Sequence, residues 1–284
     1  MARTSSGLIF DVREMTVHDG PGIRTTVFFK GCPLRCAWCH NPEGISFGPE
    51  LMVRTQGCSN CGSCRRGCLH AECAGLERCT RVCPNGLVRR AGEEIDAARL
   101  AERLLGVADL LDAAGGGYTL SGGEPLAQPV FAMELMKLLR PHHLAVETSG
   151  FCSAEVFERT IRTADLVMID LKHMNPAEHA RGTGRGNRPV LENLELLMAS
   201  GRRFAARIPL VPGYNDGPEN LLATARRLAP ARDRVQVELM SYNPMAGAKY
   251  ALVGRPYRPL AGPAQPRRVE LTPFLAHGLF ARFL

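Results

Sequence analysis

The sequence of 284 residues has no long apolar run and no export signal at its start. No window approaches the roughly 18 to 20 uncharged apolar residues that a bilayer-spanning helix needs, and the first short apolar patch is broken by Asp11 and Arg13. We therefore expect a cytoplasmic protein with no membrane partner.

The sequence also lacks a dense basic arm. The formal net charge is +7, but arginine pairs such as Arg65 with Arg66 and Arg202 with Arg203 are scattered, and five Tyr and one Trp offer little for base stacking. We expect no nucleic-acid partner. A basic surface of this kind favours docking of an acidic protein, and a merely solvated surface is the simpler alternative.

The apolar content, in contrast, is ordinary. Hydrophobic residues make up 45% of the chain, which suffices to bury a core and excludes collagen-like, coiled-coil and disordered classes. At this length we expect one main domain, or one domain with a small insert.

Cysteine is nearly absent outside one region. Ten of the 11 cysteines fall between Cys32 and Cys83, and Cys152 alone lies elsewhere. In a cytoplasmic protein such crowding indicates metal ligation rather than disulfide bonds. Cys152 has no place in these motifs, and we expect a buried, inert thiol there.

Three of the cysteines form a tight C-x3-C-x2-C group, namely Cys32, Cys36 and Cys39. Three ligands on one loop leave a fourth position of an iron–sulfur cluster open, as catalytic metal sites do. A zinc site would need a fourth ligand, and His40 is poorly placed to turn back because it adjoins Cys39. The group therefore predicts a catalytic metal centre.

The other clustered cysteines resemble the bacterial ferredoxin pattern, in which three close cysteines and a distant fourth hold a [4Fe–4S] cluster. One complete set consists of Cys58, Cys61, Cys64 and Cys83, the last followed by Pro84. The second set has only Cys68, Cys73 and Cys79, because Leu76 stands at the remaining ligand position. The second site should thus hold a three-cysteine cluster, an exchange-labile cluster or none. A pair of structural zinc sites is the alternative for the whole group.

Apolar, β-branched runs alternate with amphipathic stretches along the rest of the chain. The predicted strands are 25–30, 118–121, 144–147, 166–170, 204–209 and 235–239, and the predicted helices are 95–111, 129–139, 154–163, 190–199 and 219–228. This alternation predicts an α/β fold, a partial (β/α)6 parallel barrel formed by residues 1–49 and 90–284. Residues 50–89 would form an inserted ferredoxin-like iron–sulfur module, and residues 263–284 a closing amphipathic helix.

Polar and glycine-rich motifs follow the predicted strands, where folds of this class place their chemistry. The Cys32 group follows the first strand, and the next loops carry Gly122-Gly123-Glu124, Glu147-Thr148 and Asp170-Leu171-Lys172. Each motif alone could be a turn or a cap. Their gathering at one end of one sheet favours a single site.

These motifs together resemble the radical S-adenosylmethionine superfamily, and within it the glycyl-radical-enzyme activating enzymes. The resemblance rests on the Cys32 group with Trp38 before its last cysteine, and on the segments 19–24, 40–44, 121–126 and 170–174. It spans roughly residues 19–257. Pyruvate formate-lyase activase is the simplest relative but lacks the insert, which is like that of activases serving dehydratases, decarboxylases and lyases.

The resemblance implies a reaction and its cofactors. Cys32, Cys36 and Cys39 would hold a [4Fe–4S] cluster whose open iron chelates S-adenosylmethionine, and one electron would cleave the C5′–S bond. The resulting radical would abstract a hydrogen atom from a backbone glycine of a partner glycyl radical enzyme. One or two auxiliary iron–sulfur clusters in the insert would carry electrons from flavodoxin or ferredoxin. We expect a monomer.

The resemblance also assigns roles to single residues. Trp38 would lie beside the adenine, and Gly122, Gly123 and Glu124 would hydrogen-bond the methionyl amine. Lys172 and Arg207 would neutralise the methionyl carboxylate, with Asp170 nearby.

Two further groups of residues match the family by position. A monovalent-cation site beside the carboxylate would use Glu147, Thr148, Met168 and Asp170, and Asp19 would meet the incoming glycine loop. One departure is Asn243 after Tyr242, where the family member named above has a histidine, so one nucleoside contact does not carry over.

Two other functions are compatible with parts of the sequence. A radical S-adenosylmethionine enzyme could act on a small molecule that binds a cluster at the open position near Leu76. An electron-carrier protein fused to a barrel would not explain the Cys32 group beside Gly122-Gly123-Glu124. Only an activase would leave a stable radical on another protein.

Overall fold

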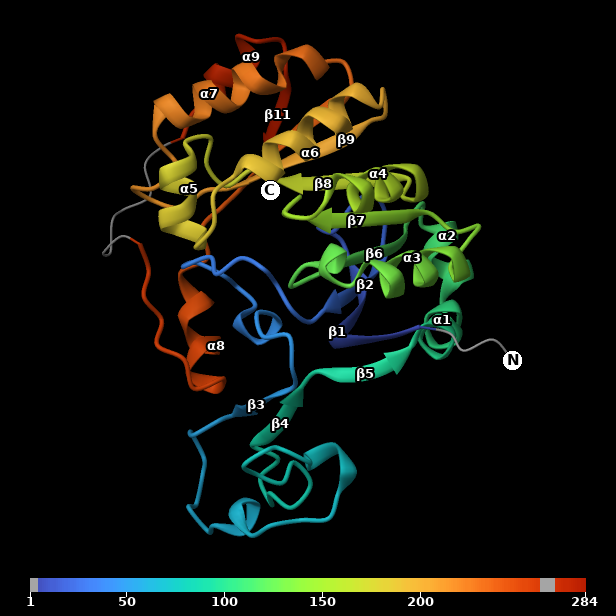
Figure 1. Ribbon diagram of the computed structural model, residues 1–284, viewed down its shortest axis with the longest axis vertical. Coiled ribbons are helices and arrows are strands. Elements are labelled where there is room, and N and C mark those ends of the chain that lie inside the picture. Colours follow the sequence, from blue (N-terminus) through green and yellow to red (C-terminus); the bar gives the residue numbers. More distant parts are fainter. Residues whose placement is uncertain (1–4, 261–268) are drawn as a thin grey trace.

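The computed structural model describes residues 5–260 and 269–284 (Figure 1). Its centre is a nine-stranded sheet in the order β11-β10-β9-β8-β7-β6-β2-β1-β5. The strands from β2 to β11 in this order run parallel, whereas β1 and β5 pair antiparallel at one edge. The bounds are β1 Ser6–Thr16, β2 Arg24–Phe29, β5 Glu93–Asp96, β6 Gly117–Gly122, β7 Leu144–Thr148, β8 Leu166–Asp170, β9 Phe204–Pro209, β10 Val235–Met240 and β11 Phe280–Phe283.

Most of the helices cover one face of this sheet and connect its parallel strands, whereas the helix of residues 247–252 packs beside the strand of residues 50–53 (Figure 1). Their bounds are α1 Ala97–Leu105, α2 Ala108–Ala113, α3 Pro129–Leu138, α4 Ala154–Thr163, α5 Pro176–Thr183, α6 Arg188–Ala199, α7 Pro218–Leu228, α8 Gly247–Leu252 and α9 Thr272–Leu275. Several begin at residues that favour a helix start. Ser153 caps α4 by accepting a hydrogen bond from the amide of Val156, proline is the first residue of α3, α5 and α7, and proline is the second residue of α6. The predicted α/β class and each predicted strand are confirmed.

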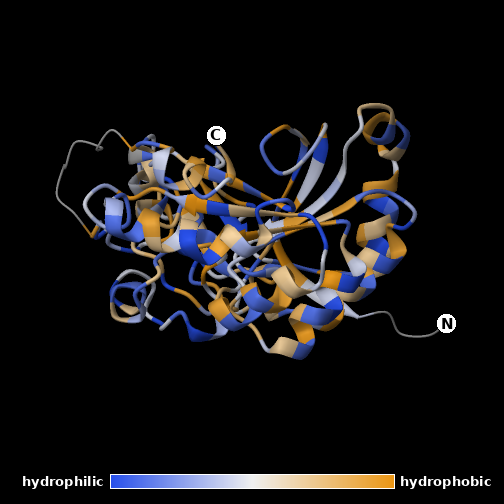
Figure 2. Cartoon of the chain, turned by 90° about the horizontal axis from the view of Figure 1, so that it is seen from above, coloured by the Kyte–Doolittle hydropathy of each residue, from blue (hydrophilic) through white to orange (hydrophobic). Residues whose placement is uncertain are grey.

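Strand residues alternate between two environments. Val146, Ile169, Ala206 and Val237 point to the helices and join one large buried cluster with side chains such as Phe157. Each fully buried large apolar side chain contributes about 1.5–3 kcal/mol to folding. In Figure 2 the strands are mostly apolar in colour, while the helices alternate between apolar and hydrophilic residues.

The opposite side of the parallel strands carries polar residues, and we call it the polar face. It consists of Thr26, Thr119, Ser121, Glu147, Asp170, Arg207 and Glu238. Because side chains alternate along a strand, one register fixes both the apolar core and this polar face. The polar face is where the candidate site lies.

The C-terminal prediction is wrong for the described residues. Residues 263–268 lie outside the described part of the chain, and residues 269–284 contain the short helix α9 followed by strand β11. Gly278 adopts a left-handed conformation (φ 71°) that ends the helix, and the alternating residues after it pair with β10. Strand β11 therefore completes the sheet by pairing with β10. The local sequence pattern of this segment favours a helix and does not indicate this pairing.

The helix predicted over 95–111 is also divided. Asp96 ends β5 and caps α1, which stops at Gly106, and α2 forms a second short helix. The long strand β1 was not predicted. It lies at the antiparallel edge of the sheet, and its Phe10 ring packs against Gly44 of the predicted segment 40–44.

Most of the cysteines lie in a segment that projects from the sheet (Figure 1). Strands β3 (Glu50–Val53) and β4 (Val88–Ala91) form a separate two-stranded sheet, and residues 54–87 connect them. Glu50 at the base pairs with Lys30, whose Nζ atom lies 2.8 Å from the carboxylate, and with Arg255. No helix within the described residues combines the length and apolarity needed to cross a membrane.

Candidate active site

The loop of Cys32, Cys36 and Cys39 begins directly after β2, at the carboxyl end of the parallel strands. Backbone hydrogen bonds hold it on two sides. The amide of Cys32 donates to the carbonyl of Ile45 at 3.1 Å, and the amide of Ala37 donates to the carbonyl of Gly182 at 3.0 Å. These hydrogen bonds fix the loop to the surrounding fold.

Glycine at position 123 is required by close backbone contacts beside this loop. The amide of Glu124 donates to the carbonyl of Gly31 at 2.8 Å. A Cβ atom at Gly123 would lie 2.4 Å from the carbonyl oxygen of Gly44 and 2.5 Å from that of Gly31. Gly122 has a φ of 114° and is equally crowded by the backbone of Phe29. The two glycines let the loop after β6 approach the cysteine loop.

The burial of the three thiols favours their binding to a metal cluster over their ionisation as free thiolates. Burial raises the pKa of Cys32 and Cys36 and raises that of Cys39 to about 12. The Lys172 ammonium partly offsets this rise at Cys36. As free thiols the three groups would stay protonated, whereas binding to iron removes the proton and shares the charge. The donor set therefore fits a cluster held by three cysteines.

Trp38 belongs to this loop and its side chain is buried, although the sequence alone did not indicate which residues pack against it. Its ring lies 5.0 Å from that of Tyr214 between ring centroids, and Val211 belongs to the same apolar cluster. The hydroxyl of Tyr214 donates to the carbonyl of Glu178 at 3.0 Å. The packing of Trp38 against Tyr214 was not predicted, because Tyr214 lies in a loop far from Trp38 in the sequence.

Glu124 is completely buried and accepts several hydrogen bonds. Its carboxylate receives the Thr148 hydroxyl at 2.7 Å and both the amide and the hydroxyl of Ser149, at 2.8 and 2.5 Å. Burial raises the pKa of Glu124, and these hydrogen bonds oppose the rise. The arrangement fixes the loop after β6 to the loop after β7 close to Cys32.

A buried charge network crosses the polar face. The guanidinium of Arg207 donates to Glu147 at 2.6 Å, to Glu238 at 3.0 Å and to the carbonyl of His18 at 2.6 Å. Burial opposes ionisation of Glu147, but Arg207 and the hydroxyl of Ser121 hold the pKa of Glu147 below its ordinary value. The sequence did not identify Glu238, because a single glutamate within a strand carries no motif of its own.

Lys172 lies between this network and the cysteine loop. Its ammonium is 2.7 Å from the carboxylate of Asp170. Burial alone would lower the pKa of Lys172, but the Asp170 carboxylate beside it raises the pKa above the ordinary value. Lys172 therefore keeps a positive charge next to the cysteines.

The residues predicted to bind a monovalent cation are only partly brought together. Asp170 and Glu147 lie on the polar face near Lys172. The Thr148 hydroxyl, however, donates to Glu124, and Met168 packs in an apolar cluster with Ala145 and Ala205. The cation role of these four residues stays a prediction.

Asp19 lies on the loop between β1 and β2 and touches the polar face. Its carboxylate accepts the Thr26 hydroxyl at 2.7 Å, and its carbonyl accepts the Thr119 hydroxyl at 2.6 Å. A cavity of ≈570 Å³ opens beside this loop, with Arg207, Met168 and Glu238 in its lining. His18 and Gly20, the neighbours of Asp19, line this cavity, but Asp19 does not, and Phe204 and Val235 place the cavity at the amino ends of β9 and β10.

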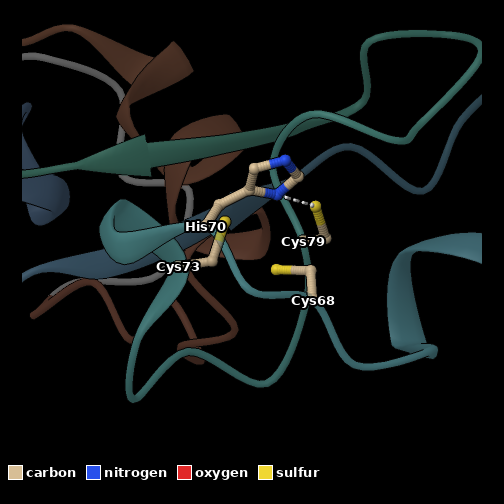
Figure 3. Close-up of side chains that lie close together, drawn as sticks. All are labelled: Cys68, His70, Cys73 and Cys79. Atoms are coloured by element: carbon tan, nitrogen blue, oxygen red, sulfur yellow. Dashed lines mark hydrogen bonds between the residues drawn. The ribbon is translucent and has the colours of Figure 1, made fainter.

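The cysteines of residues 54–87 fall into the two predicted sets. One set, Cys58, Cys61, Cys64 and Cys83, lines a second cavity of ≈570 Å³. The other set, Cys68, Cys73 and Cys79, is joined by His70 (Figure 3). His70 was missed in the sequence because it lies outside the ferredoxin spacing. Its position two residues after Cys68 was the available signal.

The sequence of this chain matches a known protein family. The profile of the radical SAM superfamily matches residues 26–228. The chain belongs to the radical SAM superfamily. The resemblance to this superfamily inferred from the motifs is confirmed.

Relatives of similar length narrow the assignment within the superfamily. The chain is 34% identical to the choline trimethylamine-lyase activating enzyme of Oleidesulfovibrio alaskensis, over 93% of each chain. It is 34% identical to the trans-4-hydroxy-L-proline dehydratase activating enzyme of Clostridioides difficile, over 75% of this chain and 76% of the relative. It is 33% identical to the 4-hydroxyphenylacetate decarboxylase activating enzyme of Clostridium scatologenes, over 88% of each. This radical SAM protein therefore belongs with the activating enzymes.

Solved structures agree on the fold. A radical SAM methyltransferase from Sphaerobacter thermophilus superposes with a TM-score of 0.55 at 18% identity, covering 97% of this chain and 76% of that one. At this identity the likeness shows the fold alone.

Proposed function

We propose that this radical SAM protein activates a partner glycyl radical enzyme by removing a hydrogen atom from one backbone glycine of that partner. A [4Fe–4S] cluster on Cys32, Cys36 and Cys39 would supply the electron that splits S-adenosylmethionine into methionine and a 5′-deoxyadenosyl radical. The radical takes the glycine hydrogen, which yields 5′-deoxyadenosine and a glycyl radical. The observation that carries the proposal is the three-cysteine loop fixed beside Glu124 and Lys172.

The chain's own groups would orient the co-substrate. Lys172 keeps its positive charge beside the cysteine loop and would attract the methionyl carboxylate. Glu124, with Gly122 and Gly123 before it, would face the methionyl amine. The guanidinium of Arg207 already donates hydrogen bonds to two carboxylates and a carbonyl, which use much of its charge. We therefore propose that Arg207 and Lys172 together neutralise the methionyl carboxylate.

The remaining roles are proposed on weaker support. Trp38 would lie along the adenine, because it forms an apolar wall with Tyr214 and Val211. Glu147, Thr148, Met168 and Asp170 would hold a monovalent cation. Asp19, which accepts a hydrogen bond from Thr26 of the polar face, would meet the glycine loop of the partner.

Residues 50–89 would form a separate module that feeds electrons to the barrel of residues 1–49 and 90–284. Cys58, Cys61, Cys64 and Cys83 line a cavity and would hold an auxiliary [4Fe–4S] cluster. A reduced flavodoxin or ferredoxin would be the donor. We further propose that the protein is monomeric and cytoplasmic.

The first experiment measures iron, sulfide and the EPR spectrum of the anaerobically reduced protein, with and without S-adenosylmethionine. The Cys36→Ala variant should lose about four irons and the spectral change that S-adenosylmethionine induces in the wild type. Cys152→Ala is the matched control and should retain both. Bound zinc without iron, or a spectrum indifferent to S-adenosylmethionine, would refute the proposal.

The partner class needs its own experiment. The names of the relatives point to choline trimethylamine-lyase, trans-4-hydroxy-L-proline dehydratase and 4-hydroxyphenylacetate decarboxylase as test substrates. Each is incubated with the reduced activase and S-adenosylmethionine, and the stable radical is counted by EPR. A radical on one of them supports the proposal and names the partner class. Rapid cleavage of S-adenosylmethionine with a radical on none would favour a small-molecule substrate.

A further inference from the structure

The segment of residues 54–87 has almost no apolar core. Within it, where every residue is described, the buried apolar side chains are Cys73 and Cys79, which are 5% and 4% exposed. Leu69, between the second set of cysteines, is fully exposed. A segment of this size without a core needs a metal or disulfide bonds to fix its fold, and its cysteines are free thiols.

The two buried cysteines belong to a compact group of donor atoms. The Sγ atoms of Cys68, Cys73 and Cys79 and a ring nitrogen of His70 all lie within 4.8 Å of one another (Figure 3). The Nδ1 atom of His70 is 3.4 Å from the Sγ atom of Cys79. Across residues 5–260 and 269–284, this is the one group of at least three His, Cys, Asp or Glu side chains with such short separations.

These separations distinguish a single ion from a cluster. Zinc bonds of about 2.3 Å to sulfur and about 2.0–2.1 Å to nitrogen, at tetrahedral angles, place the donor atoms about 3.5–3.8 Å apart. In a [4Fe–4S] cube each thiolate binds a different iron, so the thiolates lie farther apart than ligands of one ion. The compact set therefore matches one ion, whereas the first set lines a cavity and does not form such a compact group of donor atoms.

His70 supplies the donor that Leu76 lacks. The amide of Leu76 closes a turn onto the carbonyl of Cys73 at 2.9 Å, and its side chain offers no ligand atom. Three cysteines and one histidine form a normal structural zinc set. The amide of Thr80 also points at the Sγ atom of Cys73, 3.5 Å away, which is the kind of N–H donor that steadies a metal-bound thiolate.

We infer that Cys68, His70, Cys73 and Cys79 bind one zinc ion that fixes the fold of residues 54–87. Four protein donors close the site, so it has no position for a substrate, and zinc carries no electrons. The ion holds the chain around the neighbouring set of cysteines, because the amide of Cys79 donates to the carbonyl of Cys64 at 2.7 Å. The inference does not rest on the proposed function.

The test is the metal content of variants purified anaerobically from cells grown with both iron and zinc. The wild type should hold about one zinc ion per chain. His70→Ala and Cys73→Ala should lose most of the zinc and keep at least the iron of the Cys32 group, about four irons per chain. Cys61→Ala should do the reverse, losing about four irons and keeping the zinc. Leu69→Ala, a neighbour with an exposed side chain, should keep both metals.

A second measurement covers the case in which His70→Ala does not fold. His70→Cys preserves four donors and should retain zinc. After exchange of zinc for Co²⁺, the wild type should show the intense visible absorption of a tetrahedral site, and His70→Cys should shift it because sulfur replaces nitrogen. Loss of iron rather than zinc from His70→Ala would assign the site to a histidine-ligated cluster and overturn the inference. A wild type without zinc would overturn it as well.

Discussion

The loop of Cys32, Cys36 and Cys39 and the segment of residues 54–87 hold their cysteines in different ways. The loop is fixed by backbone hydrogen bonds to Ile45 and Gly182 and rests on a sheet with a large apolar core. The segment has turns, exposed side chains and two buried cysteines. A site that must stay open for a co-substrate is built on rigid elements, whereas a closed metal site can itself act as the core of a small module.

The largest expected effect comes from removing all metal. Stripping the protein anaerobically with ferricyanide and EDTA, followed by dithiothreitol, should abolish amide protection in residues 54–87 and leave the strands of the sheet protected. Structural zinc contributes about 10–16 kcal/mol to the folding of zinc-finger peptides, so a segment without a core should unfold without its metals. Hydrogen exchange read by mass spectrometry measures both regions in one sample. If the amides of residues 54–87 stayed protected after metal removal, the metals would not be what fixes the fold of this segment.

The second largest expected effect is on the free energy of unfolding of the barrel. Arg207→Ala removes the cation that the partly buried Glu147 shares with the buried Glu238, which keeps its ion pair with Arg282. The free energy of unfolding should fall by about 3 kcal/mol, the lower end of the cost of breaking a buried ion pair. Arg226→Ala, at an exposed position on α7, is the control and should change it by less than about 0.5 kcal/mol. Denaturant unfolding measures both. The zinc content should be the same in both variants, because the network lies far from residues 54–87. An Arg207→Ala protein as stable as the control would show that the network adds nothing to the barrel.

The smallest effect is a pH dependence within the same network. Arg207 holds the pKa of Glu147 below its ordinary value of 4.5, so the carboxylate stabilises the fold above that value. The contribution should disappear as the pH falls through the lowered pKa. The wild type should therefore lose more stability than Glu147→Gln between pH 6 and pH 3, as measured by thermal unfolding. Parallel curves for the two proteins would exclude this role.

Much of the site followed from the sequence because its residues sit in short motifs next to strand ends. The cysteine spacing, Gly122-Gly123-Glu124 and Asp170-Leu171-Lys172 each lie within one loop, and parallel strands bring such loops to one edge. The strands themselves were predictable from apolar, β-branched runs. The C-terminal strand β11 was not, because its partner β10 is far away in sequence and local pattern favours a helix there.

The sequence by itself determined the fold class and indicated metal ligation by the clustered cysteines, since alternation and spacing are local properties. Only the tertiary structure decided which distant groups meet. It placed Glu238 on Arg207, Tyr214 against Trp38 and His70 among the cysteines beside Leu76. Ion pairs and metal ligands depend on distances between donor atoms in space, and those distances are set by chain folding rather than by residue spacing.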